Sequence, residues 1–411
     1  MQAGSVVSAS MTANTSEGPG ERTYWVSVLL LFAAGCSVAL HIGKAPPALP
    51  VLREIWDLSL TRTGMVISIY TLLIALLGIP LGLLVRQFGN VRFAVAGIAM
   101  AGIGSMLGAD AGSLNILLLT RALEGLGWIV TVVSLPSILT SLSASRDRPL
   151  VLGIWGAFVP VGAGAMLLIA PTMQTRSGWP LSWQVAGFAS LAAAILVLLI
   201  TRRHAKSLTL LAADKSRCQT GRLDDIAKPA AWFMGLCFFV YSFQYTPVLS
   251  FLPTLFLEST SLSLATLSYL TAFVILSNAI GNVSAGILLR RGIGYQKLMS
   301  LGFLVMGGAT LVIFIDAVPF PLRLLAAALF SSVSGLIPGT LFALVPRVIG
   351  SPEGAAPVIG LMLQLSGVAQ LIGAVLLPYA VEVSGSWFAA GVVTSFAGCA
   401  GLLLVRLVWI R

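Results

Sequence analysis

The stretch from Asn115 to Leu142, NILLLTRALEGLGWIVTVVSLPSILTSL, contains one cation, Arg121, and one anion, Glu124, within an otherwise apolar run. The run is long enough to cross a lipid bilayer as a helix. A charge at membrane depth costs about 2.5–3.5 kcal/mol on insertion scales, so it faces protein, water or a partner. A spacing of three residues places both side chains on one helix face. The pair therefore indicates a polar site inside a membrane protein.

The composition of the whole chain agrees with a membrane protein. Its 411 residues are 57% hydrophobic and only 9% charged, whereas soluble domains carry about 25% charged residues. Because lipid offers the backbone no hydrogen-bond partners, spans must be helices or a closed barrel. The long continuous apolar runs exclude a barrel, whose strands alternate over about 10 residues. The sequence predicts an all-α membrane protein.

Twelve apolar segments have the length of a membrane span. They are expected at 24–46, 63–85, 92–109, 115–140, 150–172, 181–200, 231–256, 265–289, 298–315, 323–345, 357–380 and 387–407. We expect residues 1–23 to be a disordered tail and residues 201–230 to be a polar linker. These segments divide the chain into two six-helix bundles, residues 24–200 and 231–411.

The distribution of Lys and Arg predicts the orientation. If the amino terminus is inside, most of the 24 Lys and Arg residues fall in cytoplasmic loops. We therefore expect both termini in the cytoplasm and the protein in the inner membrane. The same loops explain the net charge of +10 without nucleic-acid binding. The four cysteines lie far apart and have no metal-binding spacing, so no metal or cofactor is expected.

The two halves repeat each other weakly. Gly82 and Arg86 at the end of the second span recur as Gly286 and Arg290 at the end of the eighth. An ordered series of such matches is typical of a duplicated unit. Parallel repeats of this kind place a substrate site between the halves, near the middle of the membrane.

With these motifs the chain resembles the major facilitator superfamily over essentially its whole length. In the loop GLLVRQFGNVR, Gly82, Gly89 and Arg92 match the family's glycine–acid–basic loop, but Arg86 stands where the family has Asp. That Asp joins a cytoplasmic charge network in the family, so the resemblance implies an altered network here. RALEGLG in the fourth span matches the family pattern RxxxGxG. The stretches PLVLGIWGAFVPVGAG and SFQYTPVLSFLPTLFLES further resemble the cyanate/nitroimidazole permease branch.

Two cations are candidate substrate-binding residues. By rise per residue, Lys44 and Arg121 both belong to the outer third of the membrane, and in the family the first and fourth spans line the central cavity. Together they would suit a carboxylate or another small anion, which Arg can bind in a bidentate manner. The alternative is that Glu124 neutralises Arg121 while Lys44 extends to the membrane surface.

Two further residues are candidate proton carriers. Burial raises the pKa of a carboxylate and a nearby Arg lowers it, so Glu124 could change protonation when substrate binds. A static ion pair with Arg121 is the alternative. His41, one turn before Lys44, titrates near neutral pH; the alternative is a hydrogen-bonded residue near the outer interface.

The carboxyl-terminal half offers only neutral candidates inside its spans. Gln244 and Tyr245 lie beside Pro247, where a break in the helix would free backbone groups for a ligand. Asn278 and Gln364 are further candidates, although buried amides also bond helix to helix. Trp128, on the Arg121 face of the fourth span, could line the cavity, or face lipid or the core.

These features predict a secondary transporter of a small, anionic solute that works by alternating access. We expect a monomer whose partners are a small-molecule substrate and the lipid bilayer, with proton symport as a hypothesis. The alternative is an exporter of amphipathic drugs or metabolites. An enzyme is not expected, because no nucleophile–base set or catalytic motif is visible.

Overall fold

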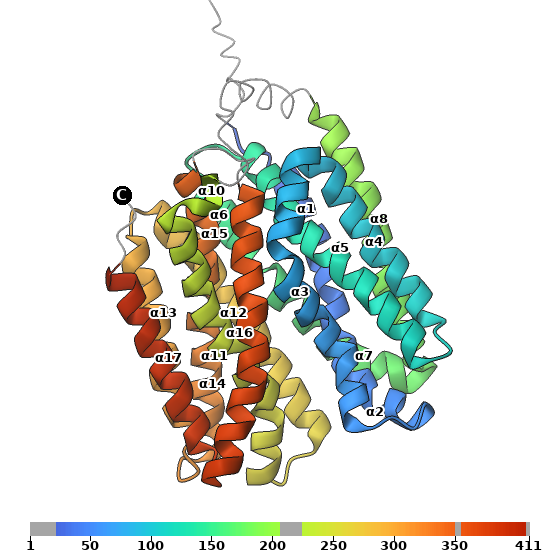
Figure 1. The fold of residues 1–411 in the computed structure, drawn as a ribbon, viewed down its shortest axis with the longest axis vertical. Coiled ribbons are helices and arrows are strands. Elements are labelled where there is room, and N and C mark those ends of the chain that lie inside the picture. Colours follow the sequence, from blue (N-terminus) through green and yellow to red (C-terminus); the bar gives the residue numbers. More distant parts are fainter. Residues whose placement is uncertain (1–21, 206–223, 350–354, 408–411) are drawn as a thin grey trace, which may run out of the picture.

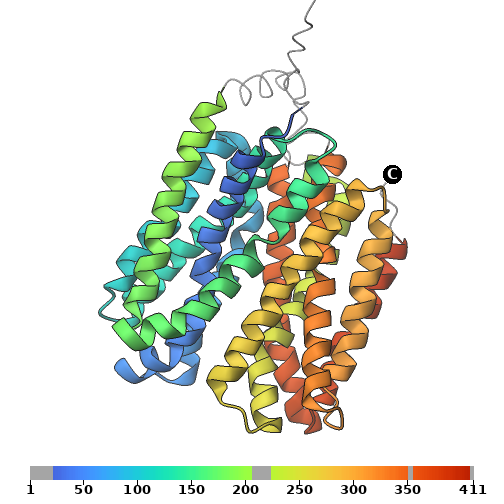
Figure 2. The same ribbon diagram turned by 180° about the vertical axis from the view of Figure 1, so that it is seen from behind.

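The computed structural model describes residues 22–205, 224–349 and 355–407, and every regular element in these ranges is a helix. Most of the expected tail and linker lie outside the described residues. Figures 1 and 2 show two groups of helices side by side, and α8 (Pro180–Arg203) ends at the same end of the molecule at which α10 (Asp224–Ala227) begins. We call this the linker end.

The first half contains α1 to α8 and the second contains α10 to α17. In the first half the helices are α1 (Trp25–Gly43), α2 (Ala45–Ile55), α3 (Leu60–Phe88), α4 (Asn90–Ala109), α5 (Leu114–Ser141), α6 (Arg148–Gly156), α7 (Phe158–Ser177) and α8 (Pro180–Arg203). In the second they are α10 (Asp224–Ala227), α11 (Pro229–Ser259), α12 (Leu264–Arg290), α13 (Tyr295–Ile313), α14 (Phe320–Ser334), α15 (Leu336–Ile349), α16 (Ala355–Ser384) and α17 (Phe388–Leu407).

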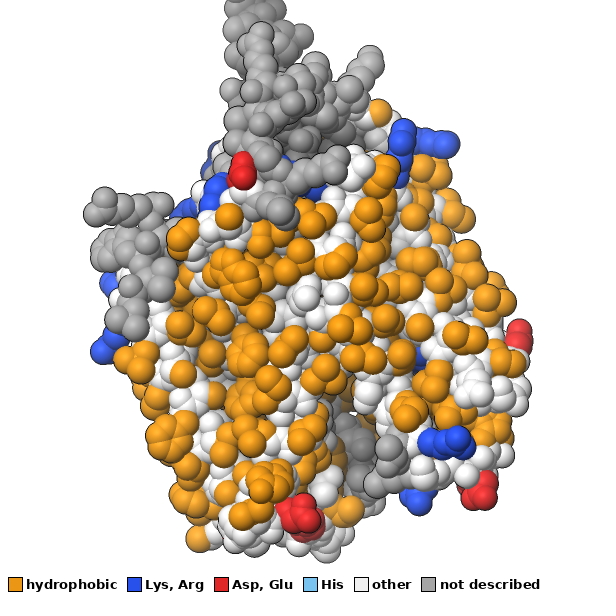
Figure 3. Space-filling view, viewed as in Figure 1, with side chains coloured by type: hydrophobic (Ala, Val, Ile, Leu, Met, Phe, Trp, Pro, Cys, Tyr) orange, Lys and Arg blue, Asp and Glu red, His pale blue; other side chains and the backbone are white. Residues whose placement is uncertain are grey.

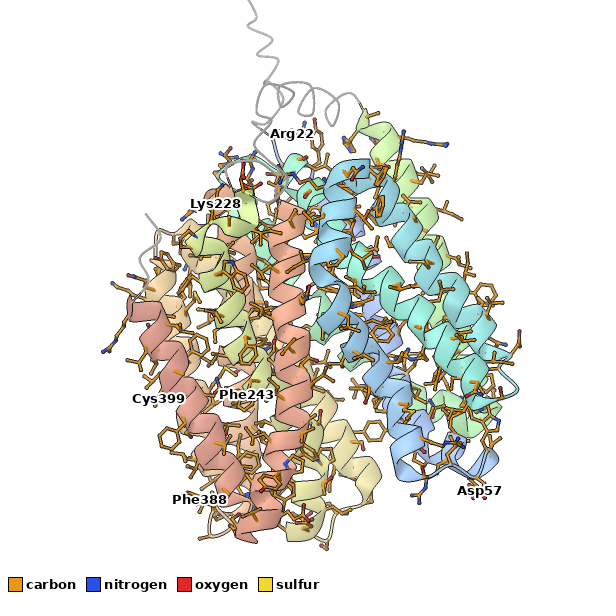
Figure 4. All side chains as sticks on the ribbon, viewed as in Figure 1. Arg22, Asp57, Lys228, Phe243, Phe388 and Cys399 are labelled. Carbon is orange, nitrogen blue, oxygen red and sulfur yellow. The ribbon has the colours of Figure 1, made fainter. Side chains whose placement is uncertain are left out.

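The described helices form twelve segments long and apolar enough to cross a membrane, which confirms the predicted fold. Hydrophobic side chains cover the middle of the molecular face in Figure 3, and charged side chains lie mainly toward its two ends. Leu119 and Phe396 are each 72% exposed, which is unfavourable in water and favourable against lipid. Arg22 and Asp57, on either side of the first span, lie at opposite ends of the molecule (Figure 4).

Three of the spans are each built from two helices. The interruptions fall at Lys44, Ala157 and Gly335. Each is followed three residues later by a proline: Pro47, Pro160 and Pro338. Because proline has no N–H, the carbonyl group four residues before it loses its helical partner. The first span, α1 together with α2, extends to Ile55, well beyond the expected residue 46.

The expected break at Pro247 is not present, because α11 continues through this proline. Proline leaves the carbonyl group of Phe243 without its helical donor. A side chain at Gly373 of α16 would contact both this carbonyl and the proline ring, so the missing side chain lets the two helices approach closely. The expectation of a ligand-accessible break beside Gln244 was wrong.

The two halves contact each other through α3 with α16 and through α6 and α7 with α12. Glycines mediate these contacts: Gly78 lies against Gly360, and Gly153 against Gly286. These four glycines, on α3, α16, α6 and α12, lie toward the linker end. At the opposite end the surface is hollowed between the halves (Figure 3).

Candidate functional site

The break between α1 and α2 places Lys44 deep inside the amino-terminal half, where its side chain is 0% exposed. Its Nζ lies 2.9 Å from Oε1 of Glu124, 2.5 Å from Oγ of Ser105 and 3.0 Å from Nδ1 of His41. An ammonium group has three N–H donors, so these three acceptors use all of them. Extension of Lys44 to the surface, the sequence-based alternative, was wrong.

Arg121, one turn before Glu124 on α5, binds the same carboxylate. Its Nη1 donates to Oε2 of Glu124 and, at 2.9 Å, to the carbonyl oxygen of His41, while its Nε donates to the carbonyl oxygen of Val66 at 3.1 Å. The guanidinium carbon lies 4.3 Å from the centre of the Tyr70 ring, a distance at which cation–π attraction is favourable. The Arg121 side chain is only 2% exposed.

The contacts of His41 define its protonation state. Nδ1 faces the Lys44 ammonium group and must accept a hydrogen bond from it. Nε2 lies 2.8 Å from Oγ of Ser190 and therefore carries the proton. Ser190 in turn donates to the carbonyl oxygen of Ser37. While Lys44 is charged and donates to Nδ1, His41 is neutral; the same nitrogen lies 3.6 Å from Oε2 of Glu124. The His41 side chain is fully buried; it is hydrogen-bonded, as in the sequence-based alternative, but it is not exposed at the surface.

The buried charge cluster, defined as His41, Lys44, Arg121 and Glu124, thus brings together four of the predicted residues. It contains two cations and one carboxylate, all at most 2% exposed. Among the described residues, the hydrogen-bond partners of its four side chains belong to α1, α3, α4, α5 and α8 of the amino-terminal half. The cluster is therefore enclosed by one half.

Trp128 lies further along α5, and its indole ring packs 6.3 Å from Phe158. Its side chain is 6% exposed, and its Nε1 has no hydrogen-bond partner among the described residues. Trp128 therefore belongs to the interior of the protein, and the lipid-facing alternative is excluded.

Two of the neutral candidates in the carboxyl-terminal half, Tyr245 and Asn278, share a partner, and a third, Gln244, has an unpaired oxygen. The Tyr245 hydroxyl lies 3.3 Å from Oγ of Ser331, and Asn278 donates to the carbonyl oxygen of the same serine at 2.9 Å. These two side chains tie α11 and α12 to α14. Gln244 is fully buried, and its Oε1 has no partner among the described residues.

Gln364 lies apart from these three residues and connects the two halves. Its Oε1 accepts a hydrogen bond of 2.9 Å from the backbone N–H of Ile79 in α3. Gly82, one turn further along α3, lies against the backbone of Ala356 in α16. The polar contact and the glycine contacts together close the space between the halves at the linker end.

The residues of the predicted loop lie at the linker end. Arg86, at the family's Asp position, binds Asp225 of α10 at 3.0 Å. Gly89 has a φ of +102°, a conformation that favours glycine, and turns the chain from α3 into α4. Arg92 lies in the first turn of α4. An aspartate from the other half thus pairs with the unusual arginine.

A second ion pair joins the halves with the repeated arginine. Arg290, the counterpart of Arg86, lies 3.1 Å from Asp147, and Asp147 also accepts a hydrogen bond of 2.6 Å from Thr23. Each half therefore contributes one arginine and one aspartate at the linker end.

Sequence reasoning did not single out Ser105, Tyr70 or Ser190, which complete the surroundings of the charge cluster. Ser105 lies in a small-residue stretch that reads as helix packing, and Tyr70 is one aromatic residue in a long apolar span. A spacing rule could not find them, because they come from other helices than Lys44 and Arg121.

The twelve-span fold and its enclosed polar site define a membrane transporter, not an enzyme. The sequence matches the Major Facilitator Superfamily over residues 27–374, and the chain belongs to this family. As in other members, its substrates are small molecules bound within the membrane.

Relatives and solved structures agree with this assignment. The chain is 23% identical to a probable sulfoacetate transporter of Cupriavidus necator over 83% of both chains, and 20% identical to a hexuronate transporter of Bacillus subtilis over 92% of this chain and 94% of the relative. It is 24% identical to the cyanate transport protein of Escherichia coli over 56% of this chain and 58% of the relative. The solved proton:xylose symporter has a TM-score of 0.76 at 16% identity, covering 94% of this chain and 95% of that chain, which shows the shared fold.

Proposed function

We propose that the protein moves a small organic anion across the inner membrane by alternating access, as a monomer with both termini in the cytoplasm. The charge cluster carries this proposal. With His41 neutral, two cations and one carboxylate leave one positive charge without a partner in a buried site. An unpaired buried charge is strongly unfavourable, and a bound anion would balance it.

The names of the relatives support an anion over a drug. The relatives that match most of this chain are named for sulfoacetate and hexuronate, covering 83% and 92% of it. The puromycin and methylenomycin A resistance proteins match only 51% and 38% of it. The relatives named for drug resistance thus match a smaller share of this chain, so they support the drug-exporter alternative less.

We also propose that Glu124 carries a proton that couples transport to the proton gradient. Its two oxygens are held by Lys44 and Arg121. An anion that bound to Arg121 would compete with Glu124 for this cation. The Glu124 carboxylate would then lose part of the positive charge that stabilises its ionised form, and its affinity for a proton would rise. Substrate and proton would then enter the site together. His41 is the weaker candidate, because the Lys44 ammonium group faces its free nitrogen.

Alternating access is the proposed role of the contact between the halves. In the orientation that we propose, the linker end is cytoplasmic, so the glycine contacts and the two ion pairs close the inner side. Separation of α3 from α16 would break the hydrogen bond between Gln364 and Ile79 and open the site inward. Gly82, Arg86, Gly89 and Arg92 would take part in this movement.

Purified protein in liposomes tests the proposal. Sulfoacetate, glucuronate and cyanate are offered with and without an inward proton gradient, and an amphipathic cation serves as the drug-like comparison. We expect uptake of at least one anion, stimulated by the gradient, and none of the cation. Arg121→Gln should abolish anion binding, while Arg323→Gln, which alters an equally buried arginine of the other half, should retain it. Uptake of the cation alone would favour the drug exporter, and uptake independent of the gradient would remove proton coupling.

A further inference from the structure

The hydrogen-bond donors around the charge cluster are unequally used. Lys44 has a partner for each of its three N–H groups. Arg121 uses Nε and Nη1 for protein acceptors, but no acceptor among the described residues pairs with the two N–H groups of Nη2. Of the two cations, Arg121 therefore has donors to offer a ligand.

Tyr70 on α3 lies directly beside this arginine. Its ring is under the guanidinium group, 4.3 Å from the guanidinium carbon, and its side chain is only 5% exposed. Its hydroxyl group is buried and has no hydrogen-bond partner among the described residues. Buried hydroxyl groups are normally paired. The described residues supply no partner for this one, so its expected partner comes from outside the protein.

The position of this hydroxyl argues against a purely structural role. The attraction between the ring and Arg121 needs an aromatic face, which phenylalanine would supply as well. The hydroxyl adds no contact within the protein, and its burial without a partner is unfavourable. A group that is costly in the empty protein is accounted for if it pairs with a ligand.

We propose that the hydroxyl of Tyr70 and the Nη2 edge of Arg121 form one oxyanion subsite, which binds a carboxylate or sulfonate group of the substrate. This inference rests on the proposed anion transport and adds a binding residue to it. A carboxylate or sulfonate has several acceptor oxygens, so one can take the guanidinium N–H groups in charge-assisted bonds and another the phenolic O–H. Lys44 is then a positioning residue that holds Glu124.

Tyr70→Phe tests the subsite, because it keeps the ring over Arg121 and removes only the hydroxyl. Binding of sulfoacetate and glucuronate to purified full-length protein is measured by titration, together with the melting temperature without ligand. Loss of a hydrogen bond to a charged group weakens binding roughly tenfold or more. We expect this loss with an unchanged or slightly higher melting temperature. Tyr269→Phe, at a tyrosine that is 36% exposed, is the matched control and should bind as the wild type does.

The outcomes separate this inference from the proposed function. If the wild type binds these anions, Arg121→Gln does not, and Tyr70→Phe binds as tightly as the wild type, Tyr70 is not part of the site and only this inference is overturned. If the wild type binds neither anion, the proposed anion function is overturned and the subsite with it. Weaker binding that is accompanied by a lower melting temperature would also count against the subsite, because it would indicate a structural role.

Discussion

Nζ of Lys44 and Oε1 of Glu124 lie 2.9 Å apart, and both side chains are 0% exposed. The contact joins the end of α1 to the middle of α5. Since Arg121 binds the other carboxylate oxygen, a single anion holds two cations from different helices. The stability of the amino-terminal half therefore depends unequally on the three residues.

Glu124→Gln should destabilise the protein far more than Lys44→Met. Loss of the carboxylate leaves two buried cations without an anion, and breaking a buried pair in this way costs about 3–5 kcal/mol. Loss of the lysine leaves Arg121 and Glu124 as a balanced pair. Melting temperatures of the two variants in the same detergent check this order. Equal losses would contradict the charge balance that we infer.

Arg290→Glu should weaken the closed state of the linker end. Arg290 lies 3.1 Å from Asp147 of the other half, and its side chain is 44% exposed. A partly exposed pair contributes at most about 1 kcal/mol, so we expect a change in transport rate of roughly fivefold or less. The control is Arg291→Glu, at the exposed neighbouring residue, which should transport normally. An identical defect in both variants would point to the overall surface charge rather than to the ion pair.

Gly78→Val should prevent α3 and α16 from closing at the linker end. A side chain at Gly78 would contact the backbone of Gly360 and Gln364, whereas no atom lies within 4 Å of the position that a side chain at Gly308 would take. Overpacking of this kind costs about 1–3 kcal/mol. We expect uptake in liposomes to be lost in Gly78→Val and retained in Gly308→Val. Normal uptake by Gly78→Val would show that this contact is dispensable.

His204 should make the protein less stable at mildly acidic pH. Burial, and secondarily the charge of Arg203, lower the pKa of His204 below its usual value of 6.5. The folded state therefore binds the proton less readily than the unfolded state. The stabilisation is complete above pH 6.5 and is lost as the pH falls from there through the lowered pKa. Melting temperatures between pH 7.5 and pH 5 should fall less in His204→Gln than in the wild type, and parallel curves would contradict this.

Local sequence patterns predicted most of the fold. Apolar runs defined twelve spans, and the three-residue spacing of Arg121 and Glu124 placed both side chains on one helix face. The expected break at Pro247 is absent, because Gly373 has no side chain and lets α16 pack closely against the proline and the freed carbonyl group. Whether a proline interrupts a span depends on the helix packed against it, and the sequence of one segment does not contain that information.

The site was less predictable because its contacts come from distant segments. The charges of Lys44 and Arg121 are conspicuous in apolar spans, so they could be found. Ser105 is 61 residues from Lys44 along the chain, and Tyr70 meets Arg121 only after α3 packs against α5. Asp225 could not be matched to Arg86 before the position of α10 was known.

Because one half alone encloses the charge cluster, a rocking movement between the halves would leave it intact while access changed from one compartment to the other. The binding energy supplied by these charges would then be similar on both faces of the membrane. A carrier with nearly equal affinities on its two sides works as readily in reverse. The direction of net flow would then follow from the concentrations of solute and coupled ion on either side.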